Sequence, residues 1–305
     1  MPDPFILSHR VAGARYVPSP NQSGYLEPAA IMLHFTASHS SAVAWLTNPD
    51  ANASAHVEID GDGTIVQMVD FNRRAWHAGT ADKGDMLYPN AAAIGIELVN
   101  PGFWRVDRTS PTGFRAPDRL PDGSYAAVPA HVVARYTVGP VTRNPVYGST
   151  DIVWVDCLPA QLAAAKALVE VLCKTYPAIG RIMVHSDARS DKSDFLSPRF
   201  PIADFKALIP RGRPDVGPPQ PPAPPSWAPG LLYAGMPKNE RVRTLQLALI
   251  ARGDLPDPKH DQADGVFGAG TERALKKAQA ALGFTGDDID GIAGPETLGR
   301  LGIAA

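Results

Sequence analysis

A run of prolines divides this chain of 305 residues into two parts. Residues 210–230 read PRGRPDVGPPQPPAPPSWAPG, and because proline fixes φ and lacks an N–H, this run cannot form a helix interior or the middle of a sheet. We interpret it as an extended, semi-stiff spacer, with a proline-rich ligand for another protein's groove as the alternative. The sequence therefore predicts a large domain over residues 1–209, a linker over 210–230 and a small domain over 231–305.

Charge and hydropathy argue against two classes of partner. The chain has 29 Lys and Arg against 31 Asp and Glu, so no broad basic field exists to hold nucleic acid or an anionic membrane. No apolar run approaches the ~20 residues that span a bilayer, which predicts no membrane insertion. Residues 1–10 do not resemble a secretory signal, so we expect a chain made in the cytoplasm. Cys157 and Cys173 are expected to be buried thiols rather than a disulfide.

Strand-like and helix-like segments alternate before the linker, which predicts an α/β fold. A helix is expected over 159–176, where an Ala- and Leu-rich segment with helical spacing begins at a proline. Residues 103–156 are rich in Pro, Gly and Arg, and we expect an insertion with little regular structure there. Apolar or alternating runs predict strands over 30–35, 55–60, 64–69, 93–99 and 182–185, the second and third joined by a hairpin turn.

The C-terminal part contains an internal repeat. The pattern D-G-x-x-G-x-x-T-x-x-x-L occurs at residues 264–275 and again at 290–301. Glycine permits tight turns, and the threonine of each copy is expected to cap the N-terminus of the helix that follows. An amphipathic segment over 242–250 precedes both copies. Together these segments predict a small bundle of three helices.

Two histidines stand where predicted strands end. His34 and His185 each follow an apolar run, and sites in sheet proteins collect at strand ends. Asp194 is the candidate third member of the group, with Asp187 and Asp191 as competitors. Two imidazoles with one carboxylate are a recurring ligand set for catalytic Zn²⁺, whereas a single histidine is more often a buried structural residue. The combination suggests hydrolysis of a carbonyl compound.

Four further side chains are candidates for the same site. Glu97 interrupts an apolar strand, so it is either a general base or an acid on an exposed strand face. Lys192, two residues before Asp194, would bring a fixed positive charge to the site. Trp76 and His77 form either a groove wall that contacts substrate or a packed aromatic beside an exposed turn.

Seven short segments, taken in order, resemble the zinc-dependent N-acetylmuramoyl-L-alanine amidases of the amidase-2 type, which share a fold with peptidoglycan recognition proteins. The resemblance covers residues 15–205, and the repeated tail resembles the three-helix peptidoglycan-binding domain. It implies a central mixed β-sheet flanked by helices, followed by the small bundle. The segments are HFTA at 34–37, SAHV at 54–57, DGTI at 62–65, RAWHAG at 74–79, IGIE at 94–97, HSD at 185–187 and KSD at 192–194.

The resemblance also implies an activity, namely hydrolysis of the amide between N-acetylmuramic acid and L-alanine in peptidoglycan. It assigns one Zn²⁺ to His34, His185 and Asp194. It assigns water activation to Glu97 and stabilisation of the oxyanion to Lys192. Peptidoglycan is the implied partner, and the tail would hold the enzyme on this polymer.

Two features depart from the family pattern. Many relatives place the lysine and the aspartate one residue further from the second histidine and continue with Pro-Gly, whereas Phe195 and Leu196 follow Asp194 here. The insertion over 103–156 is also unusual, and we expect it to reshape the substrate groove.

Other functions fit parts of the sequence. One is a peptidoglycan-binding protein without activity. Another is cytoplasmic recycling of anhydro-muropeptides, which the missing signal favours and the wall-binding tail opposes. An endolysin, or an antibacterial effector delivered by a secretion machine, explains both features, and an effector would have an immunity protein as partner. We therefore expect action on the cell wall, in the periplasm or outside the cell, after lysis or non-classical export.

Overall fold

The computed structural model describes residues 4–79, 81–84, 86, 89–148, 150–210, 232, 240–255, 263–285 and 289–303. The chain divides into two compact units, one mainly Leu26–Pro218 and the other mainly Pro219–Ala305, and each is described by itself. Apart from Pro210, the linker expected over 210–230 lies outside the described residues. Within the described ranges, no helix is both long enough and apolar enough to cross a bilayer.

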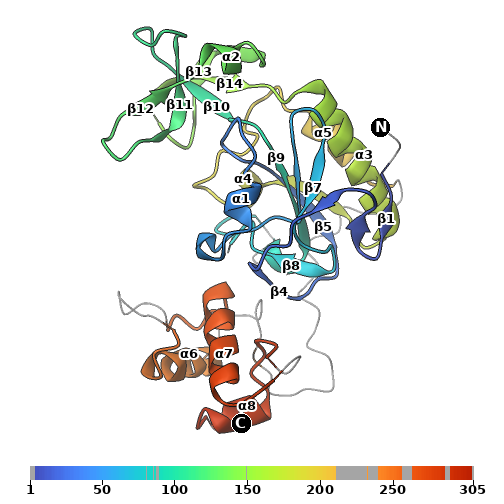
Figure 1. The fold of residues 1–305 in the computed structure, drawn as a ribbon, viewed down its shortest axis with the longest axis vertical. Coiled ribbons are helices and arrows are strands. Elements are labelled where there is room, and N and C mark those ends of the chain that lie inside the picture. Colours follow the sequence, from blue (N-terminus) through green and yellow to red (C-terminus); the bar gives the residue numbers. More distant parts are fainter. Residues whose placement is uncertain are drawn as a thin grey trace. The chain divides into compact units, whose positions relative to one another are not determined.

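The first unit is built on a six-stranded mixed sheet in the order β15-β5-β9-β6-β7-β3. Figure 1 labels its strands β5, β7 and β9. The first four strands in this order run parallel, whereas β6 and β7 form an antiparallel hairpin. The expected central mixed sheet and its five predicted strands are confirmed. The strands are β3 (Arg15–Tyr16), β5 (Ala30–Phe35), β6 (Val57–Ile59), β7 (Ile65–Gln67), β9 (Ala93–Leu98) and β15 (Arg181–Val184).

Shorter elements surround this sheet. The short strands are β1 (Ile6–Leu7), β2 (Arg10–Val11), β4 (Gln22–Tyr25) and β8 (Arg73–Ala75). The helices of this unit outside the insertion are α1 (Val43–Leu46), α3 (Pro159–Thr175), α4 (His185–Ala188) and α5 (Ile202–Lys206), with 3₁₀ turns at Pro49–Ala51 and Pro89–Ala91.

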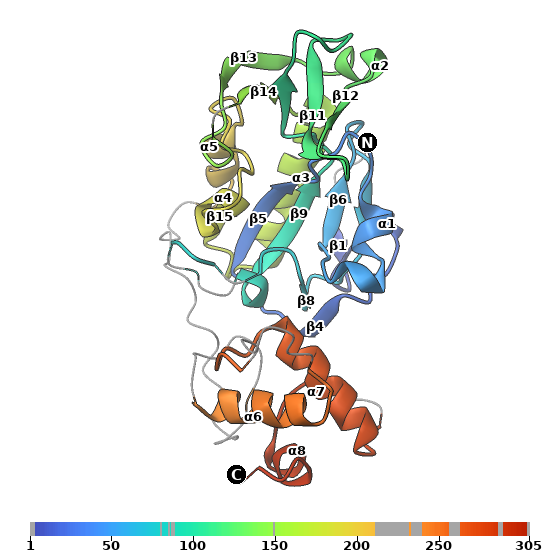
Figure 2. The ribbon, with the colours of Figure 1, turned by 90° about the vertical axis from the view of Figure 1, so that its left-hand side faces the viewer.

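Alternation along the strands makes the two faces of the sheet different. Ile31 and Leu33 of β5 belong to the main apolar core, which they share with Leu168 of α3. Figure 2 shows α3 behind β5 and β9. Met32 of β5 belongs instead to a smaller cluster on the opposite face. Because residues two apart share a face, His34 follows Met32 onto the side away from α3. The core thus leaves one face free for polar side chains at the strand ends.

Helix α3 confirms the helix expected over 159–176. Pro159 lies in its first turn, where a missing N–H costs nothing. The buried amide of Gln161 donates from Nε2 to the carbonyl oxygens of Ile59 and Val99, at 2.8 and 3.1 Å. These bonds attach the start of the helix to the ends of β6 and β9. The apolar face of α3 then runs along the sheet, where each buried leucine contributes about 1.5–3 kcal/mol.

The expectation of little regular structure over 103–156 is wrong. The segment forms a second, antiparallel sheet in the order β12-β11-β10-β14-β13, which is green in Figure 1. It has its own apolar core, in which Trp104, Val128 and Val153 are buried. Its elements are β10 (Phe103–Val106), β11 (Phe114–Arg119), β12 (Tyr125–Ala127), α2 (Ala130–Val133), β13 (Val138–Arg143) and β14 (Asp151–Val155).

The composition of this insertion marks turns between short strands rather than an irregular loop. Residues 120–124, Leu-Pro-Asp-Gly-Ser, connect β11 to β12, and Gly123 adopts φ of 82°. Gly113, with φ of 78°, ends the turn between β10 and β11. Arginines on strand faces that are not buried dilute the apolar pattern, so the alternation is weak when it is read from sequence alone.

The second unit contains the expected three helices among its described residues, α6 (Glu240–Ala251), α7 (Ala269–Ala281) and α8 (Pro295–Arg300). Their shared core buries Val242, Leu245, Phe267, Leu275 and Leu298. The expected threonine caps are wrong, because the N-cap positions are Gly268 and Gly294, and each threonine lies three residues further on.

Two glutamines explain why the D-G pattern repeats. Gln246 of α6 donates from Nε2 to Asp264 Oδ1 at 2.9 Å and to Thr271 Oγ1 at 3.1 Å, and its Oε1 accepts from Gly265 N. Gln279 of α7 holds the second copy in the same way, through Asp290 and the N–H of residue 291. Each helix therefore fixes the turn that follows it.

Candidate metal centre

Parallel strands bring the two predicted histidines together. β15 pairs with β5 so that Val184 lies opposite Leu33, which sets His185 beside His34. Asp194 enters from the loop after α4, and one ligand atom from each of the three residues lies within 4.8 Å of the others. The two Nδ1 atoms are 3.1 Å apart, and Asp194 Oδ1 lies 3.7 Å from His34 Nδ1 and 3.9 Å from His185 Nδ1.

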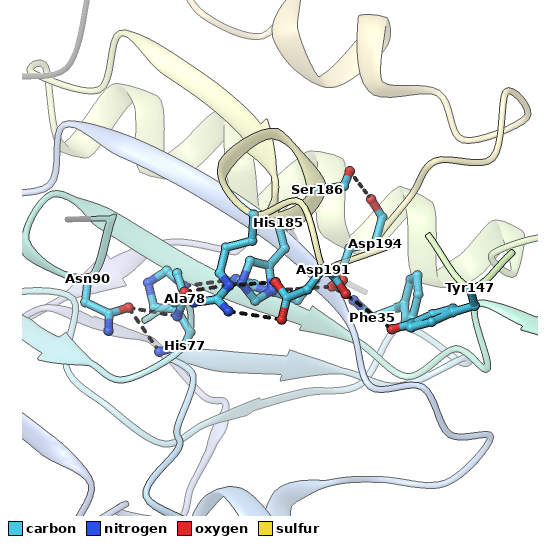
Figure 3. A network of polar contacts seen from close by, with 11 residues as sticks. Phe35, His77, Ala78, Asn90, Tyr147, His185, Ser186, Asp191 and Asp194 are labelled. Carbon is cyan, nitrogen blue, oxygen red and sulfur yellow. Dashed lines mark hydrogen bonds and ion pairs between the residues drawn. The ribbon is translucent and has the colours of Figure 1, made fainter. Parts of the chain in front are cut away.

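The two competing aspartates have other partners. Asp187 Oδ2 accepts a hydrogen bond from Val184 N at 3.1 Å, which fixes the turn that begins at His185. Asp191 forms an exposed ion pair with Arg189. Figure 3 labels Asp191 on the loop that also carries Asp194. Of the three predicted carboxylates, Asp194 is the one that reaches both imidazoles.

A chain of hydrogen bonds assigns the tautomer of His34. His77 Nε2 lies 3.1 Å from the carbonyl oxygen of Ala93, which can only accept, so His77 Nε2 carries the proton. A neutral His77 then accepts at Nδ1, 2.9 Å from His34 Nε2, so His34 donates there. Burial, with His185 and His77 nearby, holds the pKa of His34 well below its usual value. His34 is therefore neutral, with an unprotonated Nδ1.

His185 has the same tautomer for a similar reason. Its Nε2 lies 3.3 Å from the carbonyl oxygen of Ala78, and burial lowers the pKa of the ring to about 4. Two lone pairs 3.1 Å apart, with a carboxylate oxygen beside them, repel one another unless a cation lies between them. Ligand atoms around a tetrahedral Zn²⁺ are about 3.3 Å apart. The two Nδ1 atoms and Asp194 Oδ1 are separated by 3.1, 3.7 and 3.9 Å, which is close to this spacing. The residues present fit a metal ion.

The loop that carries Asp194 is held from both sides. Ser186 Oγ donates to the carbonyl oxygen of Asp194 at 2.7 Å, and Phe35 N approaches its Oδ1 at 3.4 Å. Phe195 adopts φ of 52°, a strained value for a non-glycine residue. Its ring stacks on Phe200 with the centroids 3.7 Å apart. This packing holds the loop immediately after Asp194. Burial raises the pKa of the Asp194 carboxyl to about 7, so a cation would favour its ionised form.

His77 is placed behind His34, in the position of an orienting partner. Its ring lies over Gly95 in β9, where an added Cβ would come within 2.4 Å of His77 Cγ. A glycine inside a strand often marks such a close approach, and this signal could have been read from the sequence. Trp76 is buried and does not line the cavity described below, whereas His77 does.

We expect Gly95→Ala to weaken metal binding by about 10–100-fold, as loss of an outer partner typically does, because the new methyl group displaces His77 from His34. A competition titration with a chromophoric chelator measures this. Gly24→Ala is the matched control, since its Cβ would meet open space. Equal affinity in the two variants would show that His77 does not orient the ligand.

Two carboxylates lie in line with His34 on the neighbouring strands of the sheet. Register places Glu97 of β9 opposite His34 on one side and Glu58 of β6 on the other. Glu58 accepts hydrogen bonds from Ser41 Oγ and Ala42 N. Glu97 Oε2 is buried and has no partner among the described residues. Burial, and then the charges of Asp194 and Glu58, hold the pKa of Glu97 well above its usual value, while Lys192 lowers it.

These groups face a cavity of about 580 Å³. His34, Glu97, His185, Lys192 and Asp194 all line it from the side of the main sheet. The insertion supplies another part of the cavity wall. The lining residues of that wall are Phe103, Arg105, Pro117, Arg119, Tyr125 and Tyr147.

Comparison with known proteins decides the family. The family described as N-acetylmuramoyl-L-alanine amidase matches residues 24–198, which is more than half of the chain. The chain belongs to this amidase family. A second family, described as a putative peptidoglycan binding domain, matches residues 238–301 of the amidase. The enzyme is thus a cell-wall hydrolase of the N-acetylmuramoyl-L-alanine amide, and peptidoglycan is its ligand.

Curated relatives are distant amidases. The amidase CwlA of Bacillus subtilis (strain 168) is 23% identical over 298 residues, which cover 92% of this chain and 93% of CwlA. The 1,6-anhydro-N-acetylmuramyl-L-alanine amidase AmpD of Escherichia coli (strain K12) is 27% identical over 157 residues, which cover 51% of this chain and 58% of AmpD.

One solved structure that is similar over most of the chain is a substrate complex. It is that of the amidase AmiD from E. coli with anhydro-N-acetylmuramic acid-L-Ala-D-γ-Glu-L-Lys. The two chains are 17% identical with a TM-score of 0.40, and the match covers 98% of this chain and 96% of AmiD.

Proposed function

We propose that His34, His185 and Asp194 hold one Zn²⁺ and that these residues form the catalytic centre of the amidase. The observation that carries the proposal is the convergence of three lone-pair donors, each held by a neighbour: His77, Ala78 and Ser186. When bound, Zn²⁺ would supply Lewis acidity, which polarises a carbonyl and lowers the pKa of a water molecule toward about 7.

Glu97 is the proposed general base. Its unpartnered Oε2 lies at the cavity, where it can take a proton from the attacking water and later give it to the leaving amine. Lys192 carries a positive charge on the same cavity wall. This charge favours the ionised form of Glu97 and would stabilise the oxyanion of the tetrahedral intermediate.

His77 contributes through its position. It lines the cavity and binds the ligand His34, so we assign it the role of holding that imidazole in place, with substrate contact as a further role. Trp76 packs behind this turn, and its proposed contact with substrate would require the groove to extend beyond the cavity described above.

The chemistry of the substrate adds a charge to the groove. The ligand in the AmiD complex contains a γ-linked glutamate. Such a linkage uses the side-chain carboxyl and leaves the α-carboxylate free. A stem peptide bound to this amidase would therefore present negative charge close to the scissile amide.

Digestion of purified sacculi tests the proposed function. We expect mass spectrometry to detect free stem peptides that begin with L-alanine, and we expect a chelator to abolish them and added Zn²⁺ to restore them. Glycan fragments with intact stems, or release that is unaffected by the chelator, would overturn the proposed reaction or its metal.

We propose that the C-terminal unit, the domain predicted over 231–305, holds the enzyme on the polymer and raises the local substrate concentration. Truncation after Pro210 should lower binding to sacculi by about 10²-fold or more, while cleavage of small soluble muropeptides changes little. Pelleting assays and soluble-substrate rates measure the two effects. Equal losses on both substrates would argue against anchoring.

A wall-bound polymer, rather than a soluble recycling intermediate, is the substrate we favour. Soluble anhydro-muropeptides need no anchoring domain, whereas a match to a peptidoglycan-binding family spans residues 238–301. Delivery by lysis or by a secretion machine, and an immunity protein as partner in the second case, stay predictions.

A further inference from the structure

We infer that the insertion carries a carboxylate-binding subsite for the stem peptide, formed by the guanidinium groups of Arg105 and Arg119, which both lie beside Tyr125. The inference rests on the proposed function, because it assigns one part of the same substrate to the cavity that the metal-centre residues also line. The site residues proposed above do not include Arg105, Arg119 or Tyr125.

Three strands of the insertion build the subsite. Arg105 lies on β10, Arg119 ends β11 and Tyr125 begins β12, with Arg119 and Tyr125 opposite each other in the register. Arg105 Cζ lies 4.2 Å from the centre of the Tyr125 ring, and Arg119 Cζ lies 5.6 Å from it. All three residues line the cavity that contains His34, Glu97 and Asp194.

Each guanidinium is held by one edge and leaves the other edge open. Arg105 donates from Nε to the carbonyl oxygen of Pro117, and Arg119 donates from Nε to the hydroxyl of Tyr125, both at 3.1 Å. Neither arginine has a carboxylate partner among the described side chains. The two terminal amino groups of a guanidinium match the two oxygens of a carboxylate, so these open edges suit that group.

The neighbouring arginines show the contrast. Arg115, on the same strand as Arg119, is paired with Asp107 and does not line the cavity. Arg189 and Arg199, on the loops after β15, are paired with Asp191 and Asp156. Arg105 and Arg119 differ from these three arginines because neither has a carboxylate partner among the described side chains. The hydrogen bond from Arg119, and the charge of Arg105, lower the pKa of the Tyr125 hydroxyl, which reflects their positive charge.

The occupant we infer is a carboxylate of the peptide rather than a sugar. A sugar ring binds aromatic faces, but Arg105 already covers the Tyr125 ring. The stem peptide carries the free α-carboxylate of γ-linked glutamate and a terminal carboxylate. A polymer bound by its peptide at this wall would direct the amide that precedes the L-alanine toward the metal centre.

A pair of soluble substrates tests the inference on the full chain with Zn²⁺ bound. The first is N-acetylmuramoyl-L-Ala-γ-D-Glu-L-Lys, and the second is the same molecule with both carboxylates converted to amides. We expect the wild-type enzyme to prefer the first by about 10–100-fold in kcat/KM, the range of one or two charge-assisted hydrogen bonds. The two singly amidated molecules identify which carboxylate is bound.

Variants of Arg105 and Arg119 test whether these residues cause the preference for free carboxylates. Arg119→Gln alone should reduce the preference, and the double variant Arg105→Gln, Arg119→Gln should abolish it, with turnover of the diamide close to wild type. Arg108→Gln is the matched control, because this arginine of the insertion is exposed and does not line the cavity. Because Arg119 is exposed, we expect the single variant Arg119→Gln to fold. It therefore still tests the inference if the double variant does not fold.

Three outcomes would overturn the inference. In the first, the wild-type enzyme cleaves both substrates equally well. In the second, the preference survives in Arg119→Gln and in the double variant. In the third, the variants lose activity on both substrates to the same extent, as a sugar-binding wall would predict. Each differs from failure of the proposed function, in which the wild-type enzyme cleaves neither substrate.

Discussion

Replacing Glu97 with glutamine is expected to lower kcat by about 10²–10⁴-fold, the usual contribution of a general acid–base group, while metal content stays at the wild-type level. Glutamine keeps the volume of the side chain but cannot accept the proton of the attacking water. Glu97 qualifies for this role because its buried Oε2 has no partner among the described residues and it lines the cavity. Steady-state rates on a soluble muropeptide, with metal analysis of the same sample, measure both quantities.

Glu58→Gln provides the comparison. Glu58 lies next to Glu97 in the sheet, but both of its oxygens already accept hydrogen bonds, from Ser41 and Ala42, and it does not line the cavity. We expect this variant to lose stability and to keep most of its turnover. If both variants lost activity equally, the special role of Glu97 would have to be abandoned.

Replacing Asp194 with asparagine is expected to remove the metal and, with it, nearly all activity. The loss of affinity should exceed the roughly 10–100-fold that follows loss of an outer-shell partner, because Asp194 supplies the negative charge among the three ligand groups. Without that charge, the two facing imidazole lone pairs offer the cation a neutral pair of ligands. Isothermal titration with Zn²⁺, on protein stripped by a chelator, measures the change.

Asp191→Asn is the matched control for this ligand. Asp191 lies three residues away on the same loop, but it is exposed and pairs with Arg189. We expect it to bind Zn²⁺ as the wild type does. Retention of stoichiometric metal and full activity in Asp194→Asn would move the third ligand to another residue.

The framework of the first unit was largely predictable, because its strands are nearly continuous apolar runs. The run at 30–35 and the run at 93–99 read as buried strands, and both are confirmed as β5 and β9. Their order in the sheet could not be read from periodicity, since pairing depends on contacts that are distant in sequence. It is this pairing that brings His185 to His34, 151 residues earlier in the chain.

The insertion was missed because its strands alternate weakly. Strand β10 buries Phe103 and Trp104 in succession, whereas Arg105, two residues after Phe103, is half-buried at the cavity wall. A pattern of this kind reads as irregular when prolines and glycines flank it. For the same reason, the sequence did not predict the cluster of Arg105, Arg119 and Tyr125. These residues come together only because strands β10, β11 and β12 are neighbours in the sheet.

Supporting residues were also hard to predict. Ser186 holds Asp194 and the carbonyl of Ala78 holds His185, and no local sequence pattern predicts either contact. Gly95 is the exception, since a glycine within an apolar strand is a visible signal of a close neighbour. The threonines of the tail were misread because a glycine can occupy an N-cap position, which left each threonine free to accept from a glutamine.

Metal analysis of purified, active enzyme tests the central claim most directly. If His34, His185 and Asp194 form the catalytic centre, inductively coupled plasma mass spectrometry should find close to one zinc per chain in fully active protein, and activity should fall in proportion as a chelator removes it. Full activity in protein without a stoichiometric transition metal would contradict the account.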